Sequence, residues 1–160
     1  MLQQDRLIFI HGLYGTSQGK KAIHLKSLFP DMLIPDFPGT LEERMEKLES
    51  LTAASKGWTM IGSSFGGLMA GLYARLHPER VRKLVLLAPA LIMPEFAAQP
   101  AEPLDIPTVV YIGTQDDLIP MDDLRPVAEA AFSDLVFRIV DDHHGLYDTA
   151  FQIDWNEILA

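Results

Sequence analysis

A serine at the centre of a glycine-rich pentapeptide has the surroundings of a catalytic nucleophile. Ser64 is the middle residue of Gly62-Ser63-Ser64-Phe65-Gly66, which fits the pattern G-x-S-x-G. An apolar run precedes the motif, and a run of small and apolar residues follows it from Phe65 to Leu76. A serine on a sharp turn between a strand and a helix is accessible, and the residues two positions away must be small. The alternative is an ordinary Gly/Ser turn before a helix, and the flanking strand and helix favour the nucleophile.

A serine nucleophile needs a base to take its proton and an acid to orient that base. Two acids, Asp116 and Asp117, follow the apolar run Val109–Ile112. Asp116 is the first side chain able to turn inward after the strand ends at Gly113, whereas Asp117 follows on the opposite side of the chain. We therefore expect Asp116 to be the acid. The alternative is a solvated turn without a chemical role.

Two histidines, His143 and His144, follow the apolar run Val136–Val140 and could supply the base. The order serine, aspartate, histidine places each candidate after a different strand, and the carboxyl ends of parallel strands meet at one edge of a sheet. Gly145 permits a tight approach of His144 to the serine, so we expect His144 to act. A surface pair or a weak metal site is the alternative, and we expect no metal.

The negative oxygen formed during acyl transfer needs two backbone N–H donors. One is the N–H of Phe65, directly after the nucleophile. The loop His11–Gly15 after the first predicted strand supplies the other, which we assign to Leu13, with Gly12 permitting the bend. If the strands are ordered 2-1-3-4-5-6, this loop meets the serine turn where the order reverses.

Short apolar runs alternate with amphipathic ones, which is typical of a parallel sheet with helices on both faces. Strands are expected at residues 7–10, 32–34, 58–61, 84–87, 109–112 and 136–140. Helices are expected at 17–29, 41–51, 65–76, 121–132 and 149–159. The segment Pro89–Asp105 has four prolines and no periodicity, and we expect a short lid-like loop there.

Composition narrows the class of protein. A length of 160 residues with 48% apolar content suits one domain over residues 1–160. With 22 acidic and 13 basic side chains the net charge is -9, which disfavours nucleic acid and anionic membrane as partners. The absence of cysteine excludes disulfides and thiolate catalysis. Neither a signal-peptide pattern nor a membrane-spanning run is present, so we expect a cytoplasmic protein without membrane insertion.

The segment Gly15–Lys20 has the outline of a phosphate-binding loop between a strand and a helix. It has one residue too few between its glycines, and Lys21 stands where magnesium binding needs serine or threonine. Nucleotide binding is therefore disfavoured, and no cofactor is expected.

Together these motifs resemble the α/β-hydrolase superfamily along nearly the whole chain. The segments that carry the resemblance are Phe9–Gly12, Gly62–Gly67, Gly113–Asp116 and Asp142–His144. The chain is most similar to the compact, cap-less bacterial serine esterases of the esterase and lysophospholipase type. The resemblance implies a minimal three-layer α/β sandwich, whose six-stranded, mostly parallel sheet lacks the usual first two strands. It also assigns the acid to Asp116 and the base to His144.

The expected activity is that of a serine hydrolase which cleaves carboxylic esters or thioesters of small to medium acyl groups through an acyl-enzyme. Ser64 attacks, His144 takes and returns the proton, and Asp116 orients the imidazole. The expected partner is a small-molecule ester or thioester. The side chains expected to line an apolar acyl pocket are Tyr14, Met93, Phe96, Leu118 and Leu146. The alternatives are a non-catalytic binding module on the same fold, or amide, carbon–carbon or perhydrolysis chemistry at the same serine.

Overall fold

The computed structural model describes residues 6–160 and contains a five-stranded sheet. Its strands are β1 (Leu7–Ile10), β2 (Trp58–Ser63), β3 (Val81–Leu87), β4 (Thr108–Gly113) and β5 (Leu135–Val140). They lie side by side in chain order, and each neighbouring pair is parallel. Strands β1 to β4 are largely buried, as expected of apolar strands that are covered on both faces.

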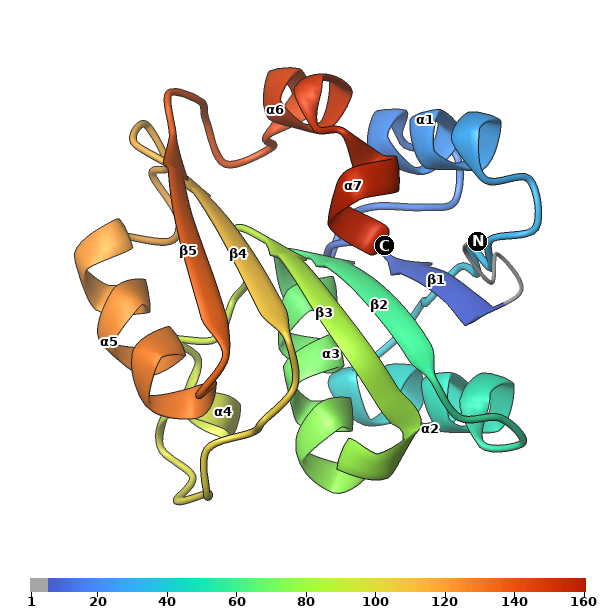
Figure 1. Cartoon of the computed structure of the whole chain (residues 1–160), viewed down its shortest axis with the longest axis horizontal. Coiled ribbons are helices and arrows are strands. Elements are labelled where there is room, and N and C mark those ends of the chain that lie inside the picture. The colour runs from blue at the N-terminus through green and yellow to red at the C-terminus, as the bar shows by residue number, and fades with distance from the viewer. Residues whose placement is uncertain (1–5) are drawn as a thin grey trace.

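Helices cover both faces of the sheet and complete three layers (Figure 1). One face carries α1 (Lys20–Leu28), α6 (Tyr147–Gln152) and α7 (Trp155–Leu159). The other carries α2 (Leu41–Thr52), α3 (Phe65–Leu76), the short α4 (Pro94–Ala97) and α5 (Met121–Ala131), with a 3-10 turn η2 (Pro78–Arg80) after α3. Right-handed crossovers place α3 and α5 on the same side. The fold class predicted from the sequence is therefore confirmed.

The sixth expected strand, at residues 32–34, is reduced to a single bridge. Leu33 pairs with Ile8, and its N–H donates to the carbonyl of Leu7 while its carbonyl accepts from the N–H of Phe9, both at 2.9 Å. Pro35 has no N–H to extend the pairing. Leu33 still pairs with the edge of β1 that faces away from β2, so the order of the chain across the sheet reverses between β1 and β2 as expected.

The expected helix at 149–159 is two helices, α6 and α7. The Asp154 carboxylate accepts a hydrogen bond from the N–H of Glu157 at 3.2 Å and caps α7. The indole of Trp155 donates to the carbonyl of Ala150 in α6 at 2.8 Å. The cap and the indole bond together hold the bend between the two helices.

The expected lid-like loop, Pro89–Asp105, is the crossover connection between β3 and β4 and contains α4. Leu91 and Phe96 are fully buried, and Leu104 pairs with Phe132 at the end of α5. Core packing thus anchors the segment at several points. Movement of this segment as a lid stays a prediction.

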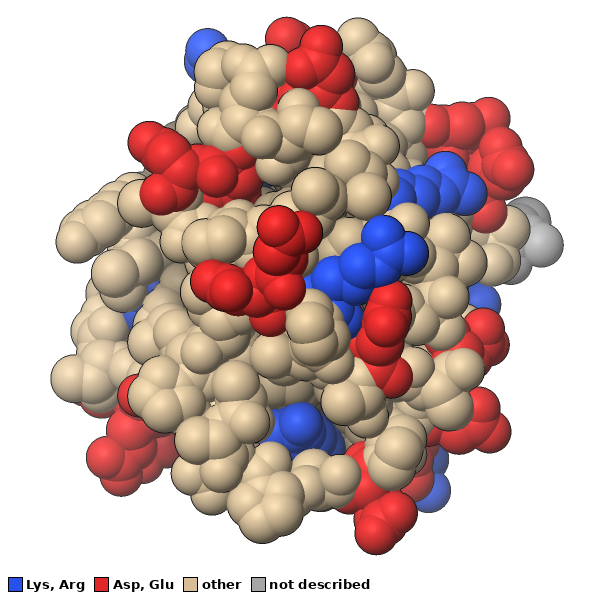
Figure 2. All heavy atoms as spheres, turned by 90° about the vertical axis from the view of Figure 1, so that its left-hand side faces the viewer, with Lys and Arg blue, Asp and Glu red and all other residues tan. Residues whose placement is uncertain are grey.

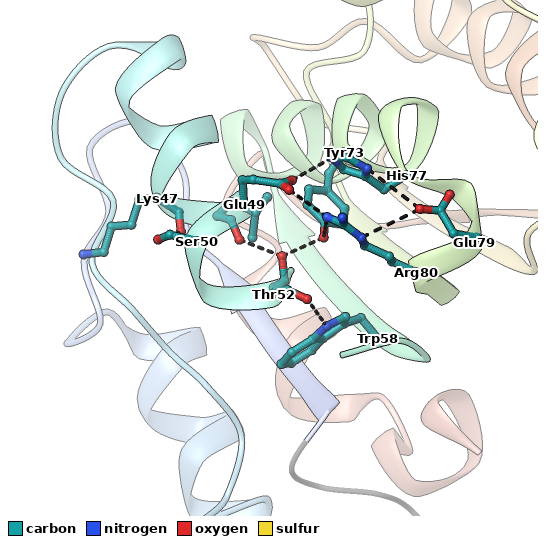
Figure 3. Close-up of polar contacts among 10 residues, drawn as sticks. Lys47, Glu49, Ser50, Thr52, Trp58, Tyr73, His77, Glu79 and Arg80 are labelled. Carbon is teal, nitrogen blue, oxygen red and sulfur yellow. Dashed lines mark hydrogen bonds and ion pairs between the residues drawn. The ribbon is translucent and has the colours of Figure 1, made fainter. Parts of the chain in front are cut away.

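A polar network ties α2 to α3, the helix that begins at the candidate nucleophile (Figure 3). The Arg80 guanidinium donates to Glu49 on α2 at 2.8 Å and lowers the pKa of that carboxyl. The hydroxyls of Thr52 and Tyr73 lie 2.7 Å apart, and the indole of Trp58 donates to the Thr52 carbonyl at 3.0 Å. Because exposed ion pairs contribute little, the buried hydroxyl and indole bonds are the stronger part of this connection.

Strand β5 forms one edge of the sheet, and Figure 2 shows the face around it. Acidic side chains are spread over this face with basic side chains between them. Arg138 lies exposed on β5 itself. A charge on an edge strand disfavours pairing with the edge of another sheet. Within residues 6–160, no helix has the length and apolar character needed to cross a membrane.

Candidate active site

Ser64 lies on a strained turn between β2 and α3. Its φ of 53° and ψ of -112° are unusual for a residue with a side chain. The N–H of Ser64 donates to the carbonyl of Leu87 at 2.9 Å, and its carbonyl accepts from the N–H of Ala90 at 2.9 Å. The end of β3 therefore holds the strained residue on both sides. Strain of this kind concentrates at functional sites, where the surrounding structure enforces it.

Two glycines leave room for the backbone of this turn, one toward β1 and one toward the start of α3. A Cβ on Gly66 would lie 2.0 Å from the carbonyl oxygen of Ile10. A Cβ on Gly62 would lie 2.5 Å from the carbonyl oxygen of Gly66. Both distances are far below van der Waals contact, so a larger residue at either position would force the backbone apart.

The carboxyl edge of the sheet brings Ser64, His144 and Asp116 into one hydrogen-bonded chain. His144 Nε2 lies 2.9 Å from Ser64 Oγ, and His144 Nδ1 lies 2.8 Å from Asp116 Oδ2. The other carboxylate oxygen of Asp116 accepts from the N–H groups of Leu118 and Ile119, at 2.9 and 2.8 Å. These bonds fix the carboxylate beside His144 Nδ1. Because a carboxylate accepts hydrogen bonds, the imidazole proton lies on Nδ1, and Nε2 is free to accept the proton of the Ser64 hydroxyl.

Neighbouring residues of the same types do not enter this chain. His143 and Asp117 are exposed. The Asp142 carboxylate accepts from the backbone N–H of His143 at 2.7 Å and from the N–H and hydroxyl of Thr149 at 3.0 and 2.7 Å. Burial raises the pKa of Asp142, but these hydrogen bonds outweigh it and leave the pKa lowered. Asp142 therefore stabilises the loop that carries His144.

The loop after β1 lies against the serine turn. A Cβ on Gly12 would lie 3.7 Å from Ser64 Cβ. Gly12, Leu13 and Phe65 line one cavity together with Ser64 and His144. Phe65 is the first residue of α3, so its N–H has no acceptor within the helix. Both residues expected to donate N–H groups therefore border the cavity.

His11, a buried side chain to which the sequence analysis gave no role, orients the peptide group before Leu13. Its Nε2 accepts from the N–H of Phe37 at 2.8 Å, so the ring proton is on Nδ1, which donates to the Gly12 carbonyl at 2.7 Å. The Gly12 carbonyl and the Leu13 N–H belong to one planar peptide group. His11 therefore sets the direction of the Leu13 N–H. Its only sequence signal is the His-Gly pair after a strand.

Arg44, on α2, is the second residue that the sequence analysis missed. It is buried, donates from Nη2 to the carbonyl of Leu13 at 3.0 Å, and lies 5.2 Å from the centre of the Phe65 ring. Burial lowers the pKa of its guanidinium. Its Nη1 is buried without a hydrogen-bond partner among residues 6–160. Arg44 thus contacts both residues whose N–H groups are expected to act together.

The cavity beside Ser64 has a volume of about 490 Å³. Of the side chains expected to form an acyl pocket, Tyr14, Met93 and Leu118 line it. Further lining residues that the sequence analysis did not assign include Lys20, Lys21 and Tyr147. Within the described part of the chain, no three His, Asp or Glu side chains gather in a way that could hold a metal ion.

Phe96 and Leu146 lie in the core instead of the cavity, which corrects their expected position. Phe96 is fully buried, with the guanidinium of Arg75 3.4 Å from its ring centre. Leu146 is also fully buried, and its φ of 50° directs the chain into α6. Each apolar side chain is thus used to anchor a connection, which leaves no surface for a substrate.

Residues 5–103 match the profile of a family described as alpha/beta hydrolase fold. No curated protein matches the sequence. One similar solved structure is alpha/beta hydrolase domain-containing protein 10 from mouse, with a TM-score of 0.77, 18% identity, and coverage of 90% of this chain and 83% of that chain. Another is Est1E from Butyrivibrio proteoclasticus, with a TM-score of 0.73, 16% identity, and coverage of 96% and 83%. A third is a monoacylglycerol lipase from Paleococcus ferrophilus, with a TM-score of 0.70, 17% identity, and coverage of 94% and 89%.

At these identities the similarity to solved structures is one of fold. The family profile, in contrast, matches the sequence itself over more than half of the 160 residues. The chain therefore belongs to the alpha/beta hydrolase fold family.

Proposed function

We propose that the protein is a serine hydrolase of the carboxylesterase or lysophospholipase type, acting on esters or thioesters of small to medium acyl groups. The observation that carries the proposal is the chain of contacts from Ser64 through His144 to Asp116, at 2.9 and 2.8 Å. It ends beside a cavity of about 490 Å³, a size that suits a small organic substrate.

The reaction begins when Ser64 Oγ attacks the carbonyl carbon of the ester and His144 Nε2 takes the hydroxyl proton. The carbonyl oxygen becomes negative and accepts hydrogen bonds from the N–H groups of Leu13 and Phe65. The tetrahedral intermediate collapses, the bond to the leaving alcohol or thiol breaks, and His144 gives its proton to that group. Water then repeats these steps on the acyl-enzyme, which releases the acid and restores the serine.

His11 and Arg44 act in this scheme as positioning residues for the negative oxygen. His11 holds the peptide group that contains the Leu13 N–H, and Arg44 holds the next carbonyl of the loop. Donors that are fixed before the reaction need no reorganisation while charge develops, which is the main source of their effect on rate.

Two further observations favour hydrolysis over a non-catalytic role of the fold. A binding module has no use for a strained serine whose hydroxyl contacts an oriented imidazole, and such strain costs about 1–3 kcal/mol. The similar solved structures include a monoacylglycerol lipase and a marine microorganism esterase, whose names denote ester cleavage. Among the contacts that residues 6–160 make in the site, none favours amide, carbon–carbon or perhydrolysis chemistry over ester cleavage.

Substitution of the two neighbouring serines tests the proposal. Ser64→Ala should abolish hydrolysis of short p-nitrophenyl esters, because the attacking oxygen is lost. The matched control is Ser63→Ala, which removes a buried hydroxyl of β2 and should retain turnover. Circular dichroism and thermal unfolding establish that both variants are folded. Retained turnover in Ser64→Ala beside loss in Ser63→Ala would overturn the assignment of the nucleophile.

A further inference from the structure

The cavity that contains Ser64 has an unusual charge for this protein. Acidic side chains outnumber basic ones by 22 to 13 in the whole sequence. Among the described residues, however, the cavity is lined by two lysines, Lys20 and Lys21, and by no aspartate or glutamate. The charge of the cavity lining is therefore positive, whereas the net charge of the chain is negative.

Both ammonium groups lie near the ring of Tyr147, which also lines the cavity. Lys20 Nζ is 5.3 Å and Lys21 Nζ is 4.9 Å from the ring centre. Lys21 Nζ also donates to the carbonyl of Gly145, next to His144, at 2.5 Å. Neither lysine has a carboxylate within 4.0 Å in residues 6–160. Since an ammonium has three N–H donors, Lys21 keeps donors for a ligand after binding Gly145.

Burial and the helix terminus act against the positive charge of this pair, and the burial effect falls on Lys21. Lys21 is half-buried, and burial lowers its pKa to about 8, with a smaller opposing effect from Asp142. Both lysines also lie at the N-terminal end of α1, where the helix dipole disfavours cations. An anion bound between them would relieve both penalties, because it would replace the lost hydration with an opposite charge.

We propose that Lys20 and Lys21 form an anion subsite within the active-site cavity, and that the natural substrate is an ester bearing a carboxylate or phosphate group. This inference rests on the proposed hydrolase function and specifies its substrate class. The ammonium pair binds the anionic group while the ester carbonyl lies at Ser64. The apolar side chains of the cavity contact the carbons between the two groups.

Matched pairs of esters with and without a negative charge test the subsite. Monoethyl adipate is compared with ethyl hexanoate, and a butyryl ester of glycerol 3-phosphate with the same ester of glycerol, by the protons released on hydrolysis at about pH 7. We expect kcat/KM to favour the charged member of at least one pair by about tenfold or more, the usual effect of a hydrogen bond to a charged group. The pair that shows the preference identifies the anion as carboxylate or phosphate.

Substitutions of Lys20 and Lys21 test whether these two residues cause the preference for the charged ester. In Lys20→Met/Lys21→Met the ratio of kcat/KM within the preferred pair should fall to near one. The ratio is the quantity to compare, because Lys21 also holds the loop next to His144 and its loss lowers turnover of both esters. Lys21→Arg keeps the charge and should keep the preference. Lys26→Met is the matched control on the same helix, since Lys26 binds the carbonyl of Met32 outside this cavity and its loss should leave the ratio unchanged.

The pH dependence of the preference provides a second readout. The groups that face Lys21 are Lys20 on its own helix, Asp142 and His144 from the loop after β5, and Tyr147 from α6. A lysine whose pKa is lowered to about 8 is charged below that pH and neutral above it. In Lys20→Met, where Lys21 supplies the only ammonium of the pair, the preference should disappear between about pH 7 and about pH 9.

The outcomes separate the subsite from the proposed function. Equal kcat/KM for both matched pairs in the wild-type protein would overturn the anion subsite while leaving the hydrolase intact. A preference that survives Lys20→Met/Lys21→Met would also overturn it. Failure of the folded wild-type protein to hydrolyse any of the esters, charged or neutral, would instead contradict the proposed function.

Discussion

Replacing Asp116 by asparagine should trap His144 in a tautomer that cannot take the serine proton. One carboxylate oxygen of Asp116 accepts from two backbone N–H groups at 2.9 and 2.8 Å, and the other lies 2.8 Å from His144 Nδ1. In the variant the amide oxygen must stay on the two N–H groups, because the amide nitrogen is itself a donor. The nitrogen then donates to His144 Nδ1, which moves the imidazole proton to Nε2, facing Ser64.

The structure sets the size of this effect. The flipped amide would restore the correct tautomer but would leave the N–H groups of Leu118 and Ile119 facing a third donor. An unpaired buried N–H costs about 1–3 kcal/mol. Ile119 is buried, whereas Leu118 is exposed and water can partly satisfy its N–H. The two N–H groups together therefore make the flip cost about 2–4 kcal/mol. This makes the active rotamer about 30-fold to 10³-fold less populated. Loss of the negative charge that stabilises the imidazolium adds to this, so we expect kcat to fall by about 10³-fold to 10⁴-fold.

Initial rates with p-nitrophenyl butyrate measure the loss, and KM should change little because Asp116 does not line the cavity. Asp117→Asn is the matched control, and its exposed side chain predicts an unchanged kcat. Asp142→Asn should mainly lower stability, since that carboxylate holds the loop through Thr149. Near-normal kcat in Asp116→Asn, beside a collapse of kcat in Asp142→Asn, would refute the reasoning.

Two further predictions concern the base and the serine turn. His144→Ala should be inactive and His143→Ala only impaired, since His144 contacts the Ser64 hydroxyl and His143 is exposed; the reverse order of damage would reassign the base. Gly66→Ala, whose Cβ would lie 2.0 Å from the carbonyl oxygen of Ile10, should lower the Tm by about 3–10 °C and reduce activity. An unchanged Tm would show that the backbone of β1 can move away from the added methyl group without loss of stability.

Elements with strong local signals could be predicted from the sequence. The helix expected at Phe65–Leu76 has the same bounds in the structure, because the serine turn begins it and Pro78 follows its end. The sequence of residues 32–34 alone could not show that the expected strand is only a single bridge. Three apolar residues between Pro30 and Pro35 have the composition of a strand, but pairing needs N–H groups that the proline cannot supply.

The positions of Ser64, Asp116 and His144 were predictable for a similar reason, since each follows a strand with an apolar run in the sequence, and parallel strands end at one edge of the sheet. Their roles in catalysis stay a prediction until activity is measured. The supporting contacts were not predictable. Lys21 binds the carbonyl of Gly145, which is 124 residues away, and Arg44 binds that of Leu13, 31 residues away. Such long-range contacts leave no periodicity or motif in the sequence.

The sequence also could not show whether an apolar side chain in a connection between β-strands faces the cavity or the core. Phe96 and Met93 belong to the same short segment and were both expected in the acyl pocket. Met93 lines the cavity, whereas Phe96 turns into the core beneath Arg75. Composition shows that a side chain is apolar, but the path of the backbone decides whether it faces a substrate or the core.

Reaction with a fluorophosphonate, followed by peptide mass spectrometry, tests most directly whether Ser64 is an activated nucleophile. Such a probe reacts rapidly with a serine whose proton is removed by a base and whose oxyanion is stabilised. We predict a single label on Ser64 that is absent in Ser64→Ala and much slower in Asp116→Asn. No label on the folded wild-type protein, or a label on Ser63, would contradict the assignment of Ser64, His144 and Asp116 as the catalytic residues.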